Sequence, residues 1–198
     1  MQEWIKASQS HQTWGVRTMT RAFRRQSNRI VSTAVHLLID AWPSGWMKSL
    51  VDVDRHPKPA YFEYRDALTP LMVDIRTDRT RYYSGEKLAI EFWVCNDHRA
   101  EFPKGELVWE VRKGDERIFG QSATAYVPSF GAAFQGYFHY QTPPVSRREK
   151  LTIRLGLKDP AGQLIHDTEM ELEIFPILDT AKNGGSVVGI VGRAGGRA

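Results

Sequence analysis

The sequence contains one cysteine, Cys95, among its 198 residues, so no disulfide can form within the chain. Cys95 lies inside a run of alternating apolar residues. At such a position a free thiol is expected to be buried and to behave as a small hydrophobe. We therefore do not expect a redox function.

Long hydrophobic runs are also missing. No apolar stretch reaches the roughly 18 residues that a membrane-spanning helix needs, and the N-terminus lacks the pattern of a secretory signal. We expect no membrane partner, and the location in the cell is left open. The sequence contains no Walker loop, no GxSxG elbow and no paired CxxC motif. The sequence therefore gives no motif that would support nucleotide binding, serine-hydrolase chemistry or a zinc ribbon.

Charge of one sign does not dominate either. The chain has 27 Lys and Arg against 23 Asp and Glu, a net charge of +4 that is spread along the sequence. Arginines gather only between Arg17 and Arg29, which raises the hypothesis of phosphate contacts with a nucleic acid. The competing interpretation, a solvated helix face, is favoured, and we expect no nucleic-acid partner. The 41% hydrophobic content is enough for a packed core.

The first seventy residues alternate between helical and strand patterns. Residues 2 to 26 lack proline and carry apolar residues at helical spacing, which predicts a helix. Ile30 to Ile39 is a nearly continuous apolar run rich in β-branched residues, which predicts a strand buried on both faces. A loop rich in Trp, Pro and Asp follows, and a second helix is predicted from about Ala60 to Leu68, before Pro70. The order helix, strand, loop, helix is typical of an α/β domain.

After Pro70 the pattern changes to period two. Apolar residues alternate with polar ones in about seven segments separated by turn residues such as Ser84-Gly85 and Lys113-Gly114-Asp115. This spacing predicts an immunoglobulin-like antiparallel β-sandwich over residues 70–176. Residues 177–198 are Gly-rich, and we expect either a disordered tail or the start of a further, truncated domain.

One segment of about forty residues has an unusual content of Trp and Pro. Within it stand the following residues: Asp40, Trp42, Pro43, Asp52, Pro57, Lys58, Pro59, Ala60 and Tyr61. This run resembles the end of the barrel domain in glycoside hydrolase family 2, the β-galactosidase, β-mannosidase and β-glucuronidase group. The run from Trp93 to Asp97 is similar to a frequent strand end of the same family. His36, Leu37 and Ile39 depart from it, because many members have Trp, Gln and Asn there.

The resemblance implies a mixed fold: residues 1–69 would be the C-terminal end of a (β/α)8, or TIM, barrel, followed by the sandwich. Retaining glycosidases use two carboxyl groups about 5 Å apart. In this family both are glutamates on earlier barrel strands, so the resemblance implies that no catalytic residue lies in this chain. The parent protein would hydrolyse β-linked carbohydrates, with the rest of the barrel as partner, while this chain alone would be inactive. A homo-oligomer is left open.

The resemblance also supplies candidate substrate-binding residues. It places Trp42 near the floor of the sugar pocket, with Asp40 and Trp46 close by, because barrel sites form at the C-terminal ends of the strands. A tryptophan that anchors a loop is the alternative for both indoles. The residues Asp40, Asp52 and Asp54 with His36 and His56 match no tight metal motif. We expect no metal and no cofactor, and attribute these acids to loop capping.

A hypothesis of a different class is a non-catalytic, immunoglobulin-like binding or adhesion module with a helical extension. The first seventy residues discriminate between the two hypotheses. A barrel fragment should leave large apolar surfaces exposed there, whereas a self-sufficient cap should bury them.

Overall fold

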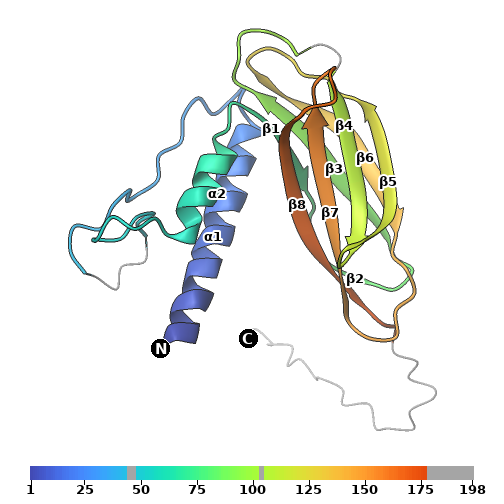
Figure 1. The fold of residues 1–198 in the computed structure, drawn as a ribbon, viewed down its shortest axis with the longest axis horizontal. Helices are drawn as coiled ribbons and strands as arrows, with labels where there is room; N and C mark the ends of the chain where they lie inside the picture. The colour runs from blue at the N-terminus through green and yellow to red at the C-terminus, as the bar shows by residue number, and fades with distance from the viewer. Residues whose placement is uncertain (44–47, 103–104, 178–198) are drawn as a thin grey trace, which may run out of the picture.

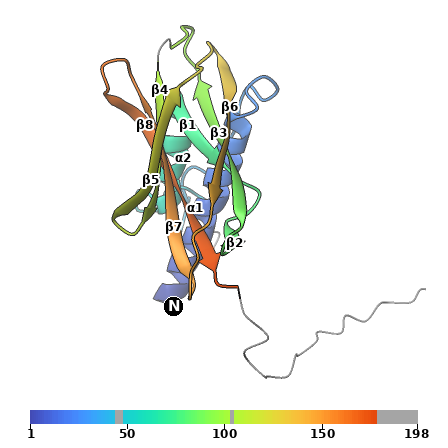
Figure 2. The same cartoon turned by 90° about the vertical axis from the view of Figure 1, so that its right-hand side faces the viewer.

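The computed structural model describes residues 1–43, 48–102 and 105–177. A helical region precedes a two-sheet β-sandwich, and the helices lie along one side of it (Figures 1 and 2). Helix α1 spans Gln2–Arg24 and helix α2 spans Pro59–Ala67, and they pack side by side. Neither helix is long and apolar enough to cross a membrane.

Both predicted helices are confirmed, and their ends have local causes. In α1, Glu3 in the first turn and Arg21 and Arg24 in the last turn complement the helix dipole. Pro59 occupies the first turn of α2, where its fixed φ suits the helix and its missing N–H costs no bond. The helix ends at Ala67, shortly before Pro70.

The strand predicted at Ile30 to Ile39 is wrong. This segment runs irregularly, with a single parallel bridge between Ile39 and Val51. Val31 is 97% exposed and Leu38 is 54% exposed, so the segment is not buried on both faces. A parallel strand needs neighbours on both sides for its N–H and C=O groups. In the described part of the helical region, only the short stretch around Leu50 and Val51 offers such a neighbour.

The sandwich prediction is confirmed. The described strands are β1 Leu71–Arg76, β2 Arg81–Tyr83, β3 Lys87–Asn96, β4 Glu106–Lys113, β5 Glu116–Thr124, β6 Gly131–Gln141, β7 Glu149–Lys158 and β8 Leu164–Phe175. One sheet has the order β1-β3-β6 and the other has the order β2-β8-β7-β4-β5. All pairs are antiparallel except β2 with β8. The three-residue β2 is the strand that periodicity does not predict.

Alternation along the strands explains the core between the sheets. In β3 the buried residues Leu88, Ile90, Phe92 and Val94 alternate with residues that face outward. In β7, Leu151, Ile153, Leu155 and Leu157 are buried in the same way. Burying each such side chain stabilises the fold by roughly 1.5–3 kcal/mol.

Cys95 is buried at the end of β3, as its apolar surroundings predict. Burial raises the pKa of its thiol to about 12. Because the thiolate is the reactive form, this cysteine is inert near neutral pH.

Candidate functional site

Asp40 lies in the irregular segment between the two helices and is almost fully buried. The Nζ atom of Lys58 lies 3.0 Å from its Oδ2 atom and donates a second bond of 2.6 Å to Ser49 Oγ. Hydrogen bonding with Ser49, together with the Lys58 ammonium, lowers the pKa of the Asp40 carboxyl below its ordinary value. Asp40 is therefore ionised at neutral pH, in a fixed internal ion pair.

This ion pair connects the segment to both helices. The backbone N–H of Lys58 donates to Leu50 O at 2.9 Å, and Lys58 is the residue directly before α2. From α1, Gln12 Nε2 donates to Ser49 O at 2.9 Å. Ser49 and Leu50 are fully buried. Asp40 thus serves to position the segment in the structure of this chain.

Of the two tryptophan candidates, Trp42 is exposed and Trp46 lies outside the described residues. Trp42 follows Asp40 by two positions, yet its side chain is 67% exposed. Among the described residues, Asp40 is brought together with Lys58 and Ser49 and not with Trp42. Trp46 falls on residues that the structure does not describe, so its predicted role stays a prediction.

A second group of polar side chains lies in the same segment. Asp52, Asp54 and His56 place their ligand-type atoms within 4.8 Å of one another, an arrangement that could hold a divalent ion. Asp52 Oδ1 accepts the N–H of His56 at 2.8 Å, and the N–H of Asp52 donates to His56 O at 3.0 Å. These two bonds close the turn between Asp52 and His56 and hold these two residues together, whereas Asp54 takes part in neither bond.

The arginines of α1 form a site that sequence reasoning missed. Arg21 is buried and donates from Nη1 to Asp74 Oδ1 at 3.1 Å and to Val73 O at 3.2 Å. Its Nη2 atom bonds the Asp66 carboxylate on α2, and Arg25 pairs with Asp74 as well. The favoured interpretation of a solvated arginine face is therefore wrong for Arg21, which lies in the contact between the helices and β1.

His166 on β8 completes this polar contact. Its Nδ1 atom accepts the N–H of Val73 at 3.3 Å, so its proton is expected on Nε2, which lies 3.3 Å from Asp66 Oδ1. Hydrogen bonding with His166 and the charge of Arg21 lower the pKa of the Asp66 carboxyl. Asp66 therefore bridges a helix and a strand through two partners.

Arg24 binds the chain where the two regions join. Its Nη1 atom donates to Ala67 O and Thr69 O, both at 3.1 Å, and its Nη2 atom donates to Pro70 O at 3.3 Å. An arginine satisfies the free carbonyls at a helix end in this way.

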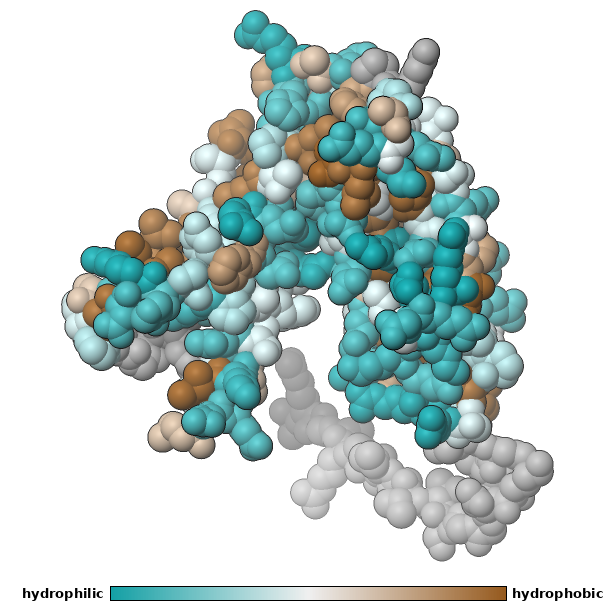
Figure 3. Space-filling model, viewed as in Figure 1, coloured by the Kyte–Doolittle hydropathy of each residue, from teal (hydrophilic) through white to brown (hydrophobic). Residues whose placement is uncertain are grey.

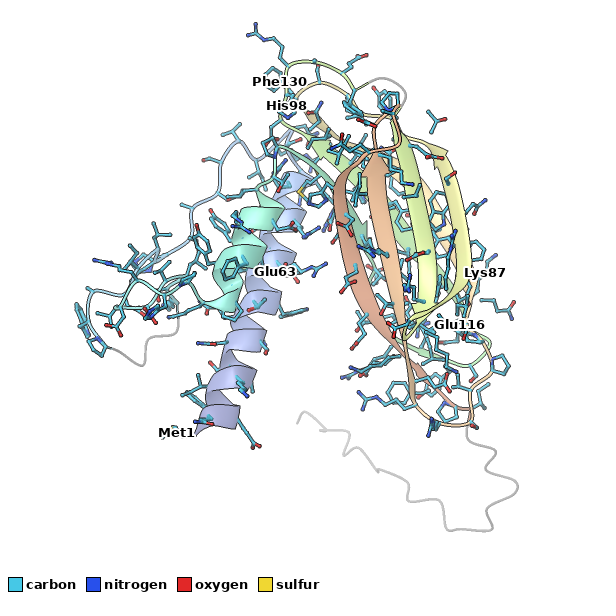
Figure 4. All side chains as sticks on the ribbon, in the orientation of Figure 1. Met1, Glu63, Lys87, His98, Glu116 and Phe130 are labelled. Atoms are coloured by element: carbon cyan, nitrogen blue, oxygen red, sulfur yellow. The ribbon has the colours of Figure 1, made fainter. Side chains whose placement is uncertain are left out.

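Arg17 links α1 to α2 as well. Its Nη1 atom lies 3.8 Å from Glu63 Oε1, and Glu63 is labelled on α2 in Figure 4. In the sequence, the spacing of these arginines by three and four residues was the available signal for this site. It did not predict which carboxylates and carbonyls the arginines would bind.

No protein-family model matches the chain, and no curated protein matches it either. Several solved structures do match the chain. The exo-chitosanase CsxA of Amycolatopsis orientalis matches with a TM-score of 0.66 and 16% identity, over 82% of this chain and 18% of that one. That structure is a complex with PNP-β-D-glucosamine, and a second structure of the enzyme matches with 15% identity. A β-glucuronidase from glycoside hydrolase family 2 matches 53% of this chain, with a TM-score of 0.41 that is too low for a comparison of folds.

The chain thus spans less than a fifth of the exo-chitosanase chain that it matches. The sandwich, from Leu71 to Phe175, makes up little more than half of this chain. A match over 82% must therefore include residues outside the sandwich. At this identity the likeness shows the fold alone: a β-sandwich with accompanying helical residues, as found in a glycoside hydrolase.

Proposed function

We propose that this chain is the C-terminal part of a retaining β-glycosidase of the family 2 type. In this proposal residues 1–69 end a TIM-barrel domain and residues 70–176 are an accessory sandwich that braces it. Residues 177–198 are a tail or the start of a further domain. The exo-chitosanase match, which covers a small part of a much longer glycosidase, supports this arrangement.

The observation that carries the proposal is the exposed apolar surface of the helical region. Figure 3 shows hydrophobic side chains over the irregular segment and near the N-terminal end of α1. The exposed large apolar residues of this region are Met1, Trp4, Ile5, Trp14, Met19, Val31, Leu37, Leu38, Ile39, Trp42, Phe62 and Leu68. A surface of this kind is a liability unless another part of the protein covers it. The remaining barrel strands and helices would cover it.

In the complete enzyme, two carboxyl groups about 5 Å apart would act as nucleophile and as acid then base. Both would lie on earlier barrel strands, and this chain would contribute to the rim of the pocket. Trp42, and Trp46 with it, would offer an indole face to the sugar. Asp40 would hold the rim in place through Lys58. The proposed substrate is a β-linked hexose or hexosamine. β-Galactosides, which some members of the family hydrolyse, fall within this class.

The test compares this chain with a longer one. We expect the 198-residue protein to release no nitrophenol from PNP-β-D-glucosaminide or PNP-β-D-galactoside above a heat-inactivated control. Joined to the polypeptide encoded immediately upstream of its gene segment, it should hydrolyse at least one of them. Turnover by the short chain, or an upstream polypeptide that lacks a barrel with two glutamates at strand ends, would refute the proposal.

The alternative of a free-standing binding or adhesion module makes a different prediction. It requires the helical region to be a self-sufficient cap, and the exposed residues around Leu38 and Trp42 favour the barrel fragment instead. Sugar-binding alone, without gain of hydrolysis in the longer chain, would favour the module.

A further inference from the structure

The outer face of the three-stranded sheet carries a continuous row of aromatic rings, which we call the aromatic strip. It consists of Trp93 on β3 and Phe134, Tyr137 and His139 on β6. Neighbouring ring centroids are 5.4, 5.0 and 6.1 Å apart along this order. Phe134 is 43% exposed and Tyr137 is 57% exposed. Trp93 is half-buried, so the exposed apolar part of the strip is Phe134 and Tyr137. Exposed aromatic neighbours of this kind can mark a binding surface.

A β-bulge places these rings on one face. Residues three apart on a regular strand point to opposite faces, so Phe134 and Tyr137 would normally be separated by the sheet. The register shifts between them, because Trp93 pairs with Phe134 whereas Phe92 pairs with Gly136. Gly136 has a φ of 121°, which favours glycine. The extra residue turns both rings outward, and bulges often re-aim side chains near functional sites.

The bulge is held in place by its own side chain. Gln135 accepts the N–H of Tyr126 at 2.9 Å and donates to Tyr126 O at 2.7 Å. These two bonds attach the bulge to the neighbouring loop. The position of Phe134 and Tyr137 is therefore built into the strand.

Charged groups lie beside the rings. Glu91 Oε2 accepts the indole N–H of Trp93 at 2.8 Å, which fixes the plane of that ring. Glu91 Oε1 pairs with Arg76 on β1, and Arg76 also bonds Asp78. The register pairs Glu91 with Arg76 on one side and with Tyr137 on the other. Hydrogen-bond donors and acceptors thus stand next to the ring faces.

We propose that the aromatic strip binds a soluble oligosaccharide. A pyranose ring offers C–H groups on its face and hydroxyl groups on its rim. The strip matches both, because rings supply apolar contact and the Glu91–Arg76 pair supplies polar partners. The charges beside the strip are of both signs: Glu91 and Asp78 are acidic and Arg76 is basic, and Arg25 and Arg29 line the same hollow as Trp93 and Phe134. A surface of mixed charge suits a neutral sugar better than a highly charged polymer.

The ring angles specify the form of the sugar. Trp93 and Phe134 are inclined by 50°, and Phe134 and Tyr137 by 69°. The strip is therefore an angled surface and not a flat one. It fits a free chain or a chain end, and it does not fit the flat surface of a crystalline polysaccharide. This binding requires no glycosidase site, so it goes beyond the function proposed above.

The experiment is a calorimetric titration of the 198-residue protein with cellopentaose and with penta-N-acetylchitopentaose. We expect at least one to bind. The double variant Phe134→Ala/Tyr137→Ala should weaken that binding about tenfold or more, a change of about 1.4 kcal/mol. Tyr83→Ala is the matched control, because Tyr83 is 56% exposed but lies on β2 of the other sheet. It should leave the affinity unchanged.

A conservative variant keeps the test sharp. Tyr137→Phe retains the ring and should retain most of the binding, while thermal melting checks that each variant is folded. The proposal is overturned if the unaltered protein binds neither sugar, or if the double variant binds as well as the unaltered protein. It is also overturned if light scattering shows that the strip instead joins two copies of the chain. Each of these results leaves the nitrophenyl-glycoside test unaffected, so the two proposals fail separately.

Discussion

The helical region and the sandwich differ in how each of them holds together. In the sandwich, apolar side chains of both sheets close a continuous core that includes Leu88, Ile153 and Leu155. In the described part of the helical region, the fully buried apolar side chains are Leu50, Ala60 and Ala67. That region instead meets the sandwich through buried ion pairs, with Arg21 at their centre. One region is complete in itself, and the other depends on contacts beyond itself.

Separating the two regions tests this difference most strongly. We expect residues 70–177 alone to fold cooperatively, because their core is intact, and residues 1–69 alone to remain largely unfolded. Circular dichroism during thermal unfolding would show a sharp transition for the first polypeptide only. A cooperative transition for residues 1–69 would mean that the helical region is a self-sufficient domain.

The buried ion pairs give the next largest effect. Asp74→Ala removes the carboxylate on β1 that pairs with the buried Arg21, and breaking a buried pair of this kind costs about 3–5 kcal/mol. The matched control is Asp78→Ala, because Asp78 is exposed and pairs with Arg76 at the surface. Its removal should cost at most about 1 kcal/mol. Urea unfolding measures both, and equal costs would contradict the role of the buried pair.

Equivalent leucine truncations compare the regions directly. Leu155→Ala removes a fully buried side chain and should lower the free energy of unfolding by about 2–5 kcal/mol. Leu38→Ala in the helical region should change it by no more than about 0.5 kcal/mol, because that side chain is already half exposed. The shift of the denaturant midpoint of each variant, at an unchanged dependence of the unfolding free energy on denaturant concentration, would measure the two losses. A large loss for Leu38→Ala would show that its segment is packed after all.

Acid should loosen the helical region and its contact with the sandwich. The pKa values of Asp40 and Asp66 are lowered from the ordinary value of 3.8. A carboxyl group with a depressed folded pKa contributes stability that is present above 3.8 and is lost as pH falls through the lower folded pKa. The effect is small, because Asp66 is partly exposed to solvent. Glu86 and Glu173 in the sandwich have lowered pKa values as well, but the sandwich also keeps a continuous apolar core that does not titrate. Limited proteolysis between pH 5 and about 2 should therefore detach the helices first, whereas simultaneous digestion of both regions would argue against it.

The sandwich was predictable because its signal is local. Alternation from Leu151 to Leu157 needs only a sheet with one apolar face, and the structure supplies one. Strand β2 escaped prediction because its three residues gain their pairing from β8, about ninety positions away. The strand predicted at Ile30 to Ile39 failed for the opposite reason. The apolar composition of this segment suits a buried strand. Burial also requires adjacent strands on both sides, and the local sequence pattern does not show whether they are present.

The candidate site was predictable only in part. The arginines between Arg17 and Arg29 were visible as a cluster on the predicted helix, but the pattern did not predict that Asp74 would pair with Arg21 and Arg25. Asp40 was singled out by resemblance as a possible sugar contact, while its ion pair with Lys58 depends on how the segment folds back. The structure thus gives Asp40 an ion-pair partner, and its predicted contact with a sugar stays a prediction. Long-range partners decide the role.

The guanidinium of Arg24 has a consequence for the motion of the molecule. It binds three carbonyls, one at the last residue of α2 and two in the short connection before β1. A joint this short, with its peptide groups held from a third element, has little freedom to twist or bend. The sandwich and the helices should therefore tumble as one rigid unit in solution. A connection held in this manner should resist any swinging motion of the sandwich relative to the helices.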